Sequence, residues 1–169
     1  RERARELRPD VAPPHGRAIA FINQKGGVGK TTMAFNTARA LAERGLRVLC
    51  LDMDPQANLS LLFGVEDPPY SIHHLLLNSV RELKALHTPV VYSEAVVQGL
   101  KMDLIPAGQE LSGLELSLAS VNTTPKQLVL KRFIEKNDLL KLYDAIVIDS
   151  PPTLGLLVVN ILCAAHGVI

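Results

Sequence analysis

The feature that most constrains this chain of 169 residues is the stretch KGGVGKTT at residues 25–32, which is separated by one residue from the apolar run AIAFIN. Glycines at this density let the backbone adopt positive φ and turn its N–H groups towards an anion. A helical pattern follows, with Ala34, Ala38 and Leu41 spaced for one buried face. A strand, a glycine-rich loop and a helix N-terminus in this order predict a site for phosphate groups.

The residue types in this loop match those that hold a nucleoside triphosphate. Lys30 can neutralise the β and γ phosphates, and the Thr31 hydroxyl stands where a magnesium ligand is needed. A chance glycine-rich turn is the competing interpretation, but the match covers eight consecutive residues between a strand pattern and a helix pattern. The residues predicted to contact the nucleotide are Lys25, Gly26, Gly27, Val28, Gly29, Lys30, Thr31 and Thr32.

Two later apolar segments each end in carboxylates. RVLCL leads to Asp52 and Asp54, and YDAIVI leads to Asp149. Ligands meet an open α/β sheet at its strand ends, and carboxylate oxygens are the ligands that magnesium prefers. We therefore predict that Asp149 holds magnesium opposite Thr31. The alternative is structural, with Asp52 and Asp54 capping a helix expected near Asn58 and Asp149 simply ending a strand.

These three segments together resemble the ParA/MinD group of ATPases. The loop has Gln24 where the usual motif has glycine, followed by an additional Lys25, and LDMDPQAN is similar to the ParA/Soj branch of that group. The resemblance covers residues 18–169. It implies that Lys25 reaches across a dimer interface to the partner's phosphates, that Asp54 orients or deprotonates the attacking water, and that Asp52 supports the magnesium shell.

The resemblance also implies a function, a slow ATPase that acts as a switch in chromosome or plasmid partition. ATP and Mg²⁺ would drive a homodimer that binds DNA without sequence preference, and a ParB-like partner would stimulate hydrolysis to ADP and phosphate. The expected location is cytoplasmic and nucleoid-associated, without a membrane. A formal net charge of +1 gives no overall attraction to DNA, so we expect the DNA-binding residues in a local patch or outside this chain.

Three alternatives share the phosphate loop. A MinD-like or cargo-positioning ATPase would act at a membrane or polar scaffold, but DPQAN favours the partition branch. An electron-transfer ATPase like the nitrogenase iron protein would share an iron–sulfur cluster, whereas Cys50 and Cys163 both fall in expected core positions. A module that binds nucleotide without hydrolysis would have no need for Asp54 as a water-positioning carboxylate.

Alternating strand and helix patterns predict a doubly wound α/β fold, a P-loop NTPase domain with a mostly parallel sheet and helices on both faces. We expect a flexible N-terminal extension over 1–17 and a ParA-like ATPase domain over 18–169, the N-terminal two thirds of a fold apparently truncated at its C-terminal end. Besides the strands already given, we expect helices over 71–77, 108–120, 125–142 and 156–165 and strands over 102–106 and 167–169.

Overall fold

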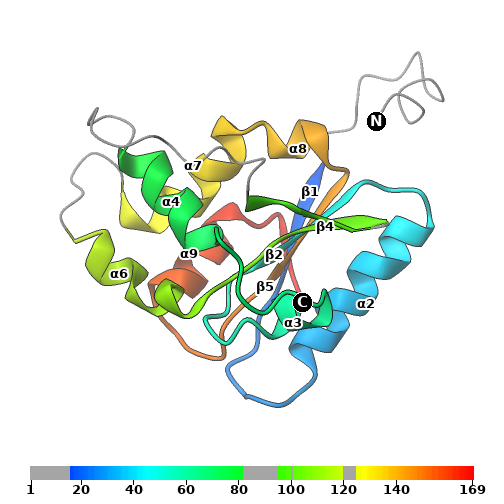
Figure 1. The fold of residues 1–169 in the computed structure, drawn as a ribbon, viewed down its shortest axis with the longest axis horizontal. Coiled ribbons are helices and arrows are strands. Elements are labelled where there is room, and N and C mark those ends of the chain that lie inside the picture. Colours follow the sequence, from blue (N-terminus) through cyan, green and yellow to red (C-terminus); the bar gives the residue numbers. More distant parts are fainter. Residues whose placement is uncertain (1–15, 82–94, 100, 120–124) are drawn as a thin grey trace.

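The computed structural model describes residues 16–81, 95–99, 101–119 and 125–169. Its centre is a six-stranded sheet with the strand order β3-β4-β2-β5-β1-β6 (Figure 1). The parallel strands are β1 (Arg17–Phe21), β2 (Val48–Asp52), β4 (Met102–Ile105), β5 (Ala145–Asp149) and β6 (Gly167–Val168). A short edge strand, β3 (Val97–Gln98), pairs antiparallel with β4. The mostly parallel α/β sheet predicted from the sequence is confirmed.

The central strands β2 and β5 are apolar up to their last residue, as expected for strands with helices on both faces. Every residue of β2 and of β5 is buried, including the aspartate that ends each strand. Cys50 lies in the middle of β2, where burial raises the pKa of its thiol to about 12. The thiol therefore behaves as a small apolar side chain, as the sequence predicts.

Helices pack on the two faces of the sheet and enclose two apolar cores (Figure 1). One face carries α2 (Lys30–Glu43) and α3 (Asn58–Leu62). The other carries α4 (Ile72–Arg81), α6 (Leu114–Ser117), α7 (Val129–Lys136), α8 (Leu139–Leu142) and α9 (Leu156–Ala164), with 3₁₀ turns at η1 (Gln109–Gly113) and η2 (Lys126–Leu128). None of the helices in the described ranges is both long enough and apolar enough to cross a bilayer.

Two expected helices differ from the structure. The helix predicted over 125–142 is divided into η2, α7 and α8, and its last break lies at Asp138, which has a left-handed φ of 52°. The helix predicted over 108–120 is a 3₁₀ turn followed by a single α-helical turn. Both expectations were wrong because the apolar spacing alone carries no information about these interruptions.

The start of the described chain is fixed to the sheet. Gly16 donates its N–H to the carbonyl of Leu140 at 2.8 Å, and Arg17, at the end of the expected extension, already belongs to β1. Residues 1–15 lie outside the described residues.

The strand order brings three strand ends together. β5 lies between β1 and β2, so Asp149 is in register with Phe21 on one side and with Asp52 on the other. Phe21 leads into the glycine-rich loop, and Asp52 leads towards Asp54. The carboxyl edge of the sheet therefore gathers the three segments that the sequence singles out.

Candidate active site

The glycine-rich loop reaches α2 through two glycines in the left-handed region. Gly27 has φ 72° and Gly29 has φ 80°, a conformation that a side chain at either position would strain. Gly29 is the N-cap of α2, and no side chain caps this helix N-terminus. The first N–H groups of α2 are thus available to an anion. The remaining residues of the loop, Gly26 and Val28, and Thr32 in the first helical turn are exposed.

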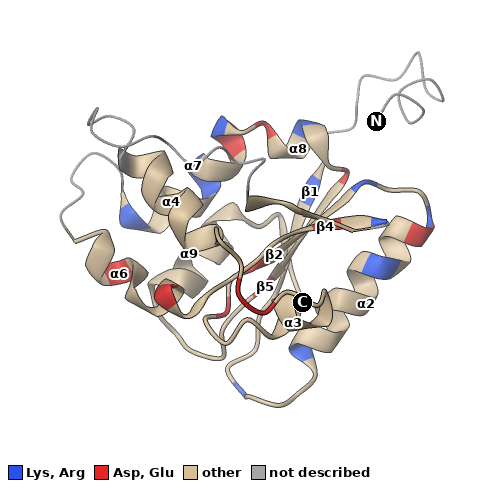
Figure 2. Cartoon of the chain, viewed as in Figure 1, with Lys and Arg blue, Asp and Glu red and all other residues tan. Residues whose placement is uncertain are grey.

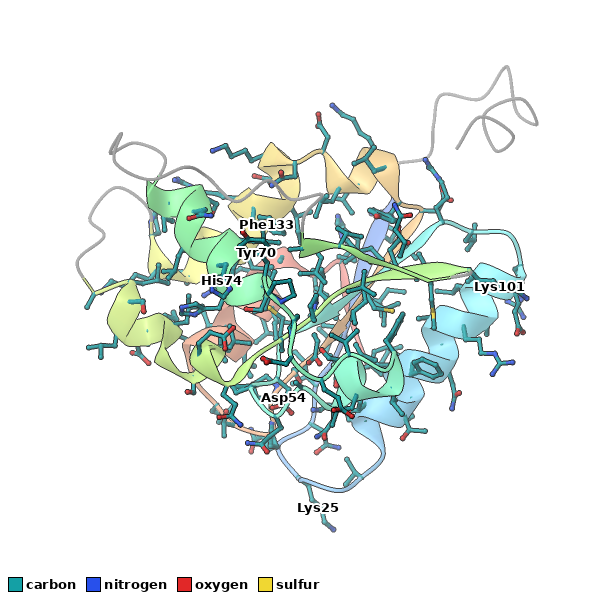
Figure 3. The ribbon with its side chains drawn as sticks, viewed as in Figure 1. Lys25, Asp54, Tyr70, His74, Lys101 and Phe133 are labelled. Carbon is teal, nitrogen blue, oxygen red and sulfur yellow. The ribbon has the colours of Figure 1, made fainter. Side chains whose placement is uncertain are left out.

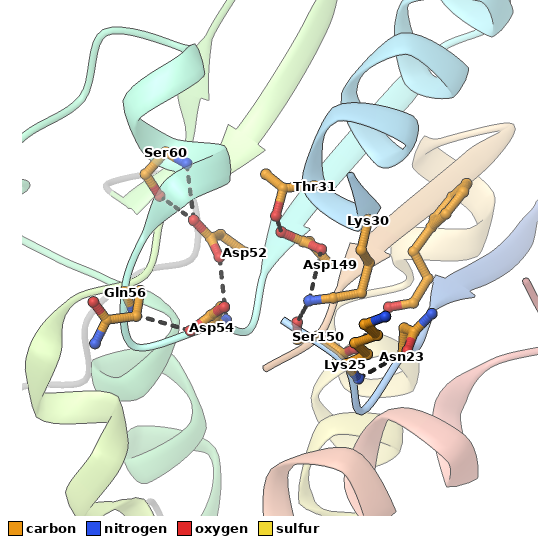
Figure 4. Close-up of polar contacts among 11 residues, drawn as sticks. Asn23, Lys25, Lys30, Thr31, Asp52, Asp54, Gln56, Ser60, Asp149 and Ser150 are labelled. Carbon is orange, nitrogen blue, oxygen red and sulfur yellow. Dashed lines mark hydrogen bonds and ion pairs between the residues drawn. The ribbon is translucent and has the colours of Figure 1, made fainter. Parts of the chain in front are cut away.

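Lys30 and Thr31 begin α2 and point towards the end of β5 (Figure 4). The Lys30 amine donates to the carbonyl oxygen of Ser150 and lies 3.6 Å from Asp149 Oδ1. The Thr31 hydroxyl donates to Asp149 Oδ2 at 2.6 Å. The predicted phosphate lysine therefore lies beside Thr31 and Asp149, two of the three residues predicted at the magnesium site.

Asp149 is fully buried and incompletely partnered. Its Oδ1 accepts no hydrogen bond within the described structure, although the Lys30 charge lies nearby. Burial raises the pKa of this carboxyl, the neighbouring Asp54 charge adds to the effect, and Thr31 and Lys30 oppose it. A buried carboxylate oxygen beside a hydroxyl is a donor set that a hard divalent cation satisfies.

No group of three or more His, Cys, Asp or Glu side chains in the described ranges could hold a metal ion by itself. Asp149 and Thr31 nevertheless fit a magnesium site in which further oxygen ligands come from phosphate groups and water.

Asp52 ends β2 and uses both oxygens in hydrogen bonds within the chain (Figure 4). Oδ1 accepts the Asp54 N–H at 3.1 Å, and Oδ2 accepts the Ser60 N–H at 2.8 Å and the Ser60 hydroxyl at 2.7 Å. Burial raises the pKa of Asp52 to about 6, and the bonds from Ser60 and Asp54 oppose that rise. Asp52 thus accepts hydrogen bonds from the first turn of α3, which is the structural role considered as its alternative. No observed contact joins it to Thr31.

Asp54 lies in the turn that follows β2 and is only 4% exposed. Its Oδ1 accepts the Gln56 N–H at 3.0 Å, and its carbonyl accepts the Ala57 N–H at 2.8 Å. Ala57 is the N-cap of α3, where no side chain caps the helix. The Asp54 carboxylate therefore shapes the turn rather than capping the helix.

Lys25 lies apart from these groups. Its side chain is exposed and extends from the tip of the loop away from the sheet (Figure 3), while its backbone N–H donates to Asn23 Oδ1 at 2.9 Å. The loop thus presents one lysine, Lys30, towards its own site and a second lysine towards solvent.

Ser60 is the participant that the sequence analysis missed. It is fully buried and binds Asp52 through two donors. Its position in the first turn of a helix that follows the aspartate pair was the available signal, because serine side chains favour hydrogen bonds at helix N-termini.

Comparison with known proteins agrees with this geometry. Residues 16–169 match the family described as the AAA domain. The chain is 38% identical over 156 residues to the sporulation initiation inhibitor protein Soj of Bacillus subtilis, with 91% of this chain and 57% of Soj covered. It is 39% identical over 157 residues to the chromosome partitioning protein ParA of Myxococcus xanthus, covering 91% of this chain and 51% of ParA.

Among solved structures, the chain is similar to a cobyrinic acid a,c-diamide synthase from Mycobacterium smegmatis with bound ATP analog and magnesium. The TM-score is 0.78 and the identity 38%, with 90% of this chain and 57% of that chain covered. The chain spans about half the length of the curated relatives it matches, with 49% to 57% covered among the first of them.

Proposed function

This chain belongs to the AAA domain family and, within it, to the ParA/Soj-type proteins, and from that premise we propose that it is an ATP-dependent switch for chromosome or plasmid partition. In this proposal, ATP and Mg²⁺ join two copies in a sandwich dimer, the dimer binds DNA without sequence preference, and a ParB-like partner stimulates slow ATP hydrolysis. The observation that carries the proposal is the convergence of Lys30 and Thr31 on Asp149, which lies 118 residues beyond Thr31.

The loop suits the phosphates of ATP by charge and by donor direction. The Lys30 amine already faces the site, where it contacts Ser150 and Asp149, and ATP binding would exchange these contacts for phosphate oxygens. Asp149 and Thr31 would hold Mg²⁺, which neutralises charge on the phosphates when it is bound. Asp52 is a weaker candidate for a magnesium ligand, because both of its oxygens already accept hydrogen bonds from N–H and O–H donors.

Asp54 is the group we assign to the attacking water. It lies on the same sheet edge as Asp149, it is almost fully buried, and the Gln56 N–H fixes one of its oxygens. A carboxylate held in this way can orient water and accept its proton, and such positioning is most of what phosphoryl transfer requires of a protein.

Lys25 supports the dimer in this proposal. A loop lysine that points away from its own phosphate site can complete the site of a second copy that faces it (Figure 3). The cation then reaches the phosphates only in the dimer, so the ATP state and the dimeric state stabilise each other, as a trans-acting arginine does in other NTPases.

DNA binding is assigned to a local basic patch or to residues outside this chain. Acidic and basic residues are interspersed along the described elements (Figure 2), and the basic excess on α7 is small, with Lys131, Arg132 and Lys136 against Glu135. Affinity for the phosphate backbone requires a local excess of Lys and Arg. The partition function itself rests on the names of the relatives Soj and ParA.

A second candidate follows from the M. smegmatis structure, whose protein is named a cobyrinic acid a,c-diamide synthase. An amide-forming enzyme spends ATP to activate a carboxyl group, so its turnover of ATP depends on cobyrinic acid and an amine donor. ATP turnover that rises with cobyrinic acid and glutamine, and not with DNA, would favour the synthase. Co-sedimentation with lipid vesicles but not with DNA would instead favour a MinD-like ATPase.

The experiment that tests the switch is the molar mass of the Asp54→Ala variant by light scattering, first in ADP–Mg²⁺ and then in ATP–Mg²⁺. We expect a monomer with ADP and a dimer with ATP, because loss of the water-positioning carboxylate preserves the ATP state. A monomer under both conditions, with bound ATP shown by nucleotide analysis, would contradict the proposed switch.

The role of Lys25 is tested by adding Lys25→Ala to the Asp54→Ala variant. We expect ATP to remain bound and the ATP-dependent dimer to weaken. Lys101→Ala is the matched control, since Lys101 is also an exposed lysine but lies far from Lys25 in the molecule (Figure 3). An unchanged dimer in the Lys25 variant would remove the trans-acting lysine from the mechanism.

A further inference from the structure

Ser60 connects two strand ends beneath the proposed hydrolytic site. It is fully buried in α3, and its N–H and hydroxyl both donate to Asp52 Oδ2, at 2.8 and 2.7 Å. The same hydroxyl oxygen accepts the Ala107 N–H at 3.1 Å, in the segment that follows β4. Because the hydroxyl donates to one group and accepts from another, its rotation is fixed.

The bonds of Asp52 continue from Ser60 to the carboxylate assigned to the attacking water (Figure 4). Asp52 Oδ2 is held by Ser60, and its Oδ1 accepts the Asp54 N–H at 3.1 Å. Asp54 Oδ1 in turn accepts the Gln56 N–H at 3.0 Å. The direction of the Asp54 side chain thus depends on a turn in which Asp52 fixes the Asp54 N–H.

We propose that Ser60 is a positioning residue for ATP hydrolysis, which acts through Asp52 to hold the Asp54 turn. The proposal rests on the proposed ATPase function and adds a residue to it. Ser60 contacts neither the phosphate loop nor Asp149 in any observed hydrogen bond, so its effect falls on the water-positioning side of the site and leaves the phosphate-binding side intact.

A helix cap alone does not account for the arrangement. The Ser60 N–H already binds Asp52 and would do so in an alanine variant, because the backbone is unchanged. The hydroxyl adds a second donor to the same oxygen and links it to Ala107. The side chain therefore fixes the angle of the Asp52 carboxylate between β2 and β4, and this angle determines where Oδ1 meets the Asp54 N–H.

The test compares Ser60→Ala with Ser60→Thr, which keeps the hydroxyl, in the full chain. For Ser60→Ala we expect kcat for ATP to fall about tenfold while the Kd for ATP changes less than about twofold, because only the nucleophile side is displaced. Ser60→Thr should retain a kcat within about threefold of the wild type. The control is Ser79→Ala, since Ser79 is a half-buried serine in α4 whose hydroxyl donates to the Leu76 carbonyl.

A double variant tests whether Ser60 acts through Asp52. If Ser60 acts through Asp52, Ser60→Ala added to Asp52→Asn should lower kcat no further than Asp52→Asn alone. The Asp52 substitution has then already disturbed the contacts that link Ser60 to the Asp54 turn. Multiplied losses in the double variant would overturn the proposal. So would a wild-type kcat in Ser60→Ala, or a Ser60→Thr variant as slow as Ser60→Ala.

Amide hydrogen exchange separates this proposal from the proposed function. In Ser60→Ala, the Asp54 and Gln56 amides should exchange faster than in the wild type without nucleotide, while amides in β5 keep their protection. If the wild-type chain does not hydrolyse ATP, the proposed function fails and exchange still tests the Ser60 contact. Unchanged exchange at Asp54 and Gln56 would overturn the positioning role in either case.

Discussion

An aspartate lies at each end of β5, and the two aspartates differ in how fully the chain satisfies their hydrogen bonds. Asp144, just before the strand, accepts the Arg47 N–H at 2.8 Å and two guanidinium donors at 3.1 and 2.9 Å. Asp149, the last residue of the strand, is buried with one oxygen that accepts no hydrogen bond in the described structure. The amino end is satisfied by the chain itself, whereas the carboxyl end remains ready for a ligand.

The same contrast extends to the neighbouring strands. At the amino end, Asp103 accepts the Tyr143 hydroxyl at 2.8 Å, and the Asp144 hydrogen bonds raise the pKa of Arg47. At the carboxyl end, burial raises the pKa of both Asp52 and Asp149. The amino edge of the sheet therefore stabilises the fold. The carboxyl edge holds buried carboxylates whose charge lowers stability when no cation is bound.

The largest effect is expected when the carboxyl edge loses its lysine. Lys30→Ala should lower the affinity for ATP by at least about a hundredfold, because a partly buried ammonium that faces the phosphates is removed. Equilibrium binding of ATP, with Lys101→Ala as the control, measures this loss. Retained affinity in Lys30→Ala would mean that the loop is not the phosphate site.

The next effect is a pH dependence of stability that arises at the carboxyl edge. The pKa of Asp52 is raised from 3.8 to about 6 in the folded chain, so its protonation stabilises the fold below pH 4, and this stabilisation is lost as the pH rises through 6. The free energy of unfolding should fall by at most about 3 kcal/mol over this range. Denaturant unfolding of wild type and Asp52→Asn at several pH values measures the difference. An equally steep decline in the variant would remove Asp52 as its source.

A smaller effect is a change in the free energy of unfolding that has opposite signs for substitutions at the two ends of β5. Asp149→Asn should raise the free energy of unfolding at pH 8, without nucleotide, by about 1 kcal/mol, because a buried charge with a raised pKa is replaced by a neutral side chain. Urea unfolding measures the change. A loss of stability in this variant would show that the Asp149 charge is already compensated within the chain.

The smallest effect belongs to the amino end. Asp144→Asn should lower the free energy of unfolding by about 0.5 kcal/mol, because two charge-assisted bonds to a partly exposed Arg47 are weakened. ATP binding should remain at the wild-type level. A change in ATP affinity as large as that of an Asp149 variant would contradict the separation of the two edges.

The sequence was sufficient to predict the sheet and its carboxyl edge because both depend on local patterns. The apolar segments that end in Asp52 and Asp149 gave the positions of β2 and β5 to within one or two residues. KGGVGKTT predicted a phosphate loop followed by a helix, and α2 begins at Lys30 within this motif. These patterns did not specify the register that sets Asp149 beside Asp52.

Features that depend on tertiary contacts were not predictable in the same way. The break at Asp138 requires a left-handed aspartate, which the neighbouring apolar spacing does not signal, although Asp tolerates this conformation better than most residues. The edge strand β3 is two residues long and exists through its pairing with β4. The Ser60 contact joins α3 to Asp52 and to Ala107, and the separation of 47 positions between Ser60 and Ala107 hides it from sequence spacing.

The central claim, that the carboxyl end of β5 is kept incomplete for a nucleotide-bound cation, is tested most directly by calorimetry of ATP binding with and without Mg²⁺. In the wild type and in Asp144→Asn, Mg²⁺ should strengthen ATP binding by about tenfold or more, whereas in Asp149→Asn it should change the affinity by less than about twofold. An equal effect of Mg²⁺ in all three proteins would contradict the claim, as would a wild-type chain that does not bind ATP.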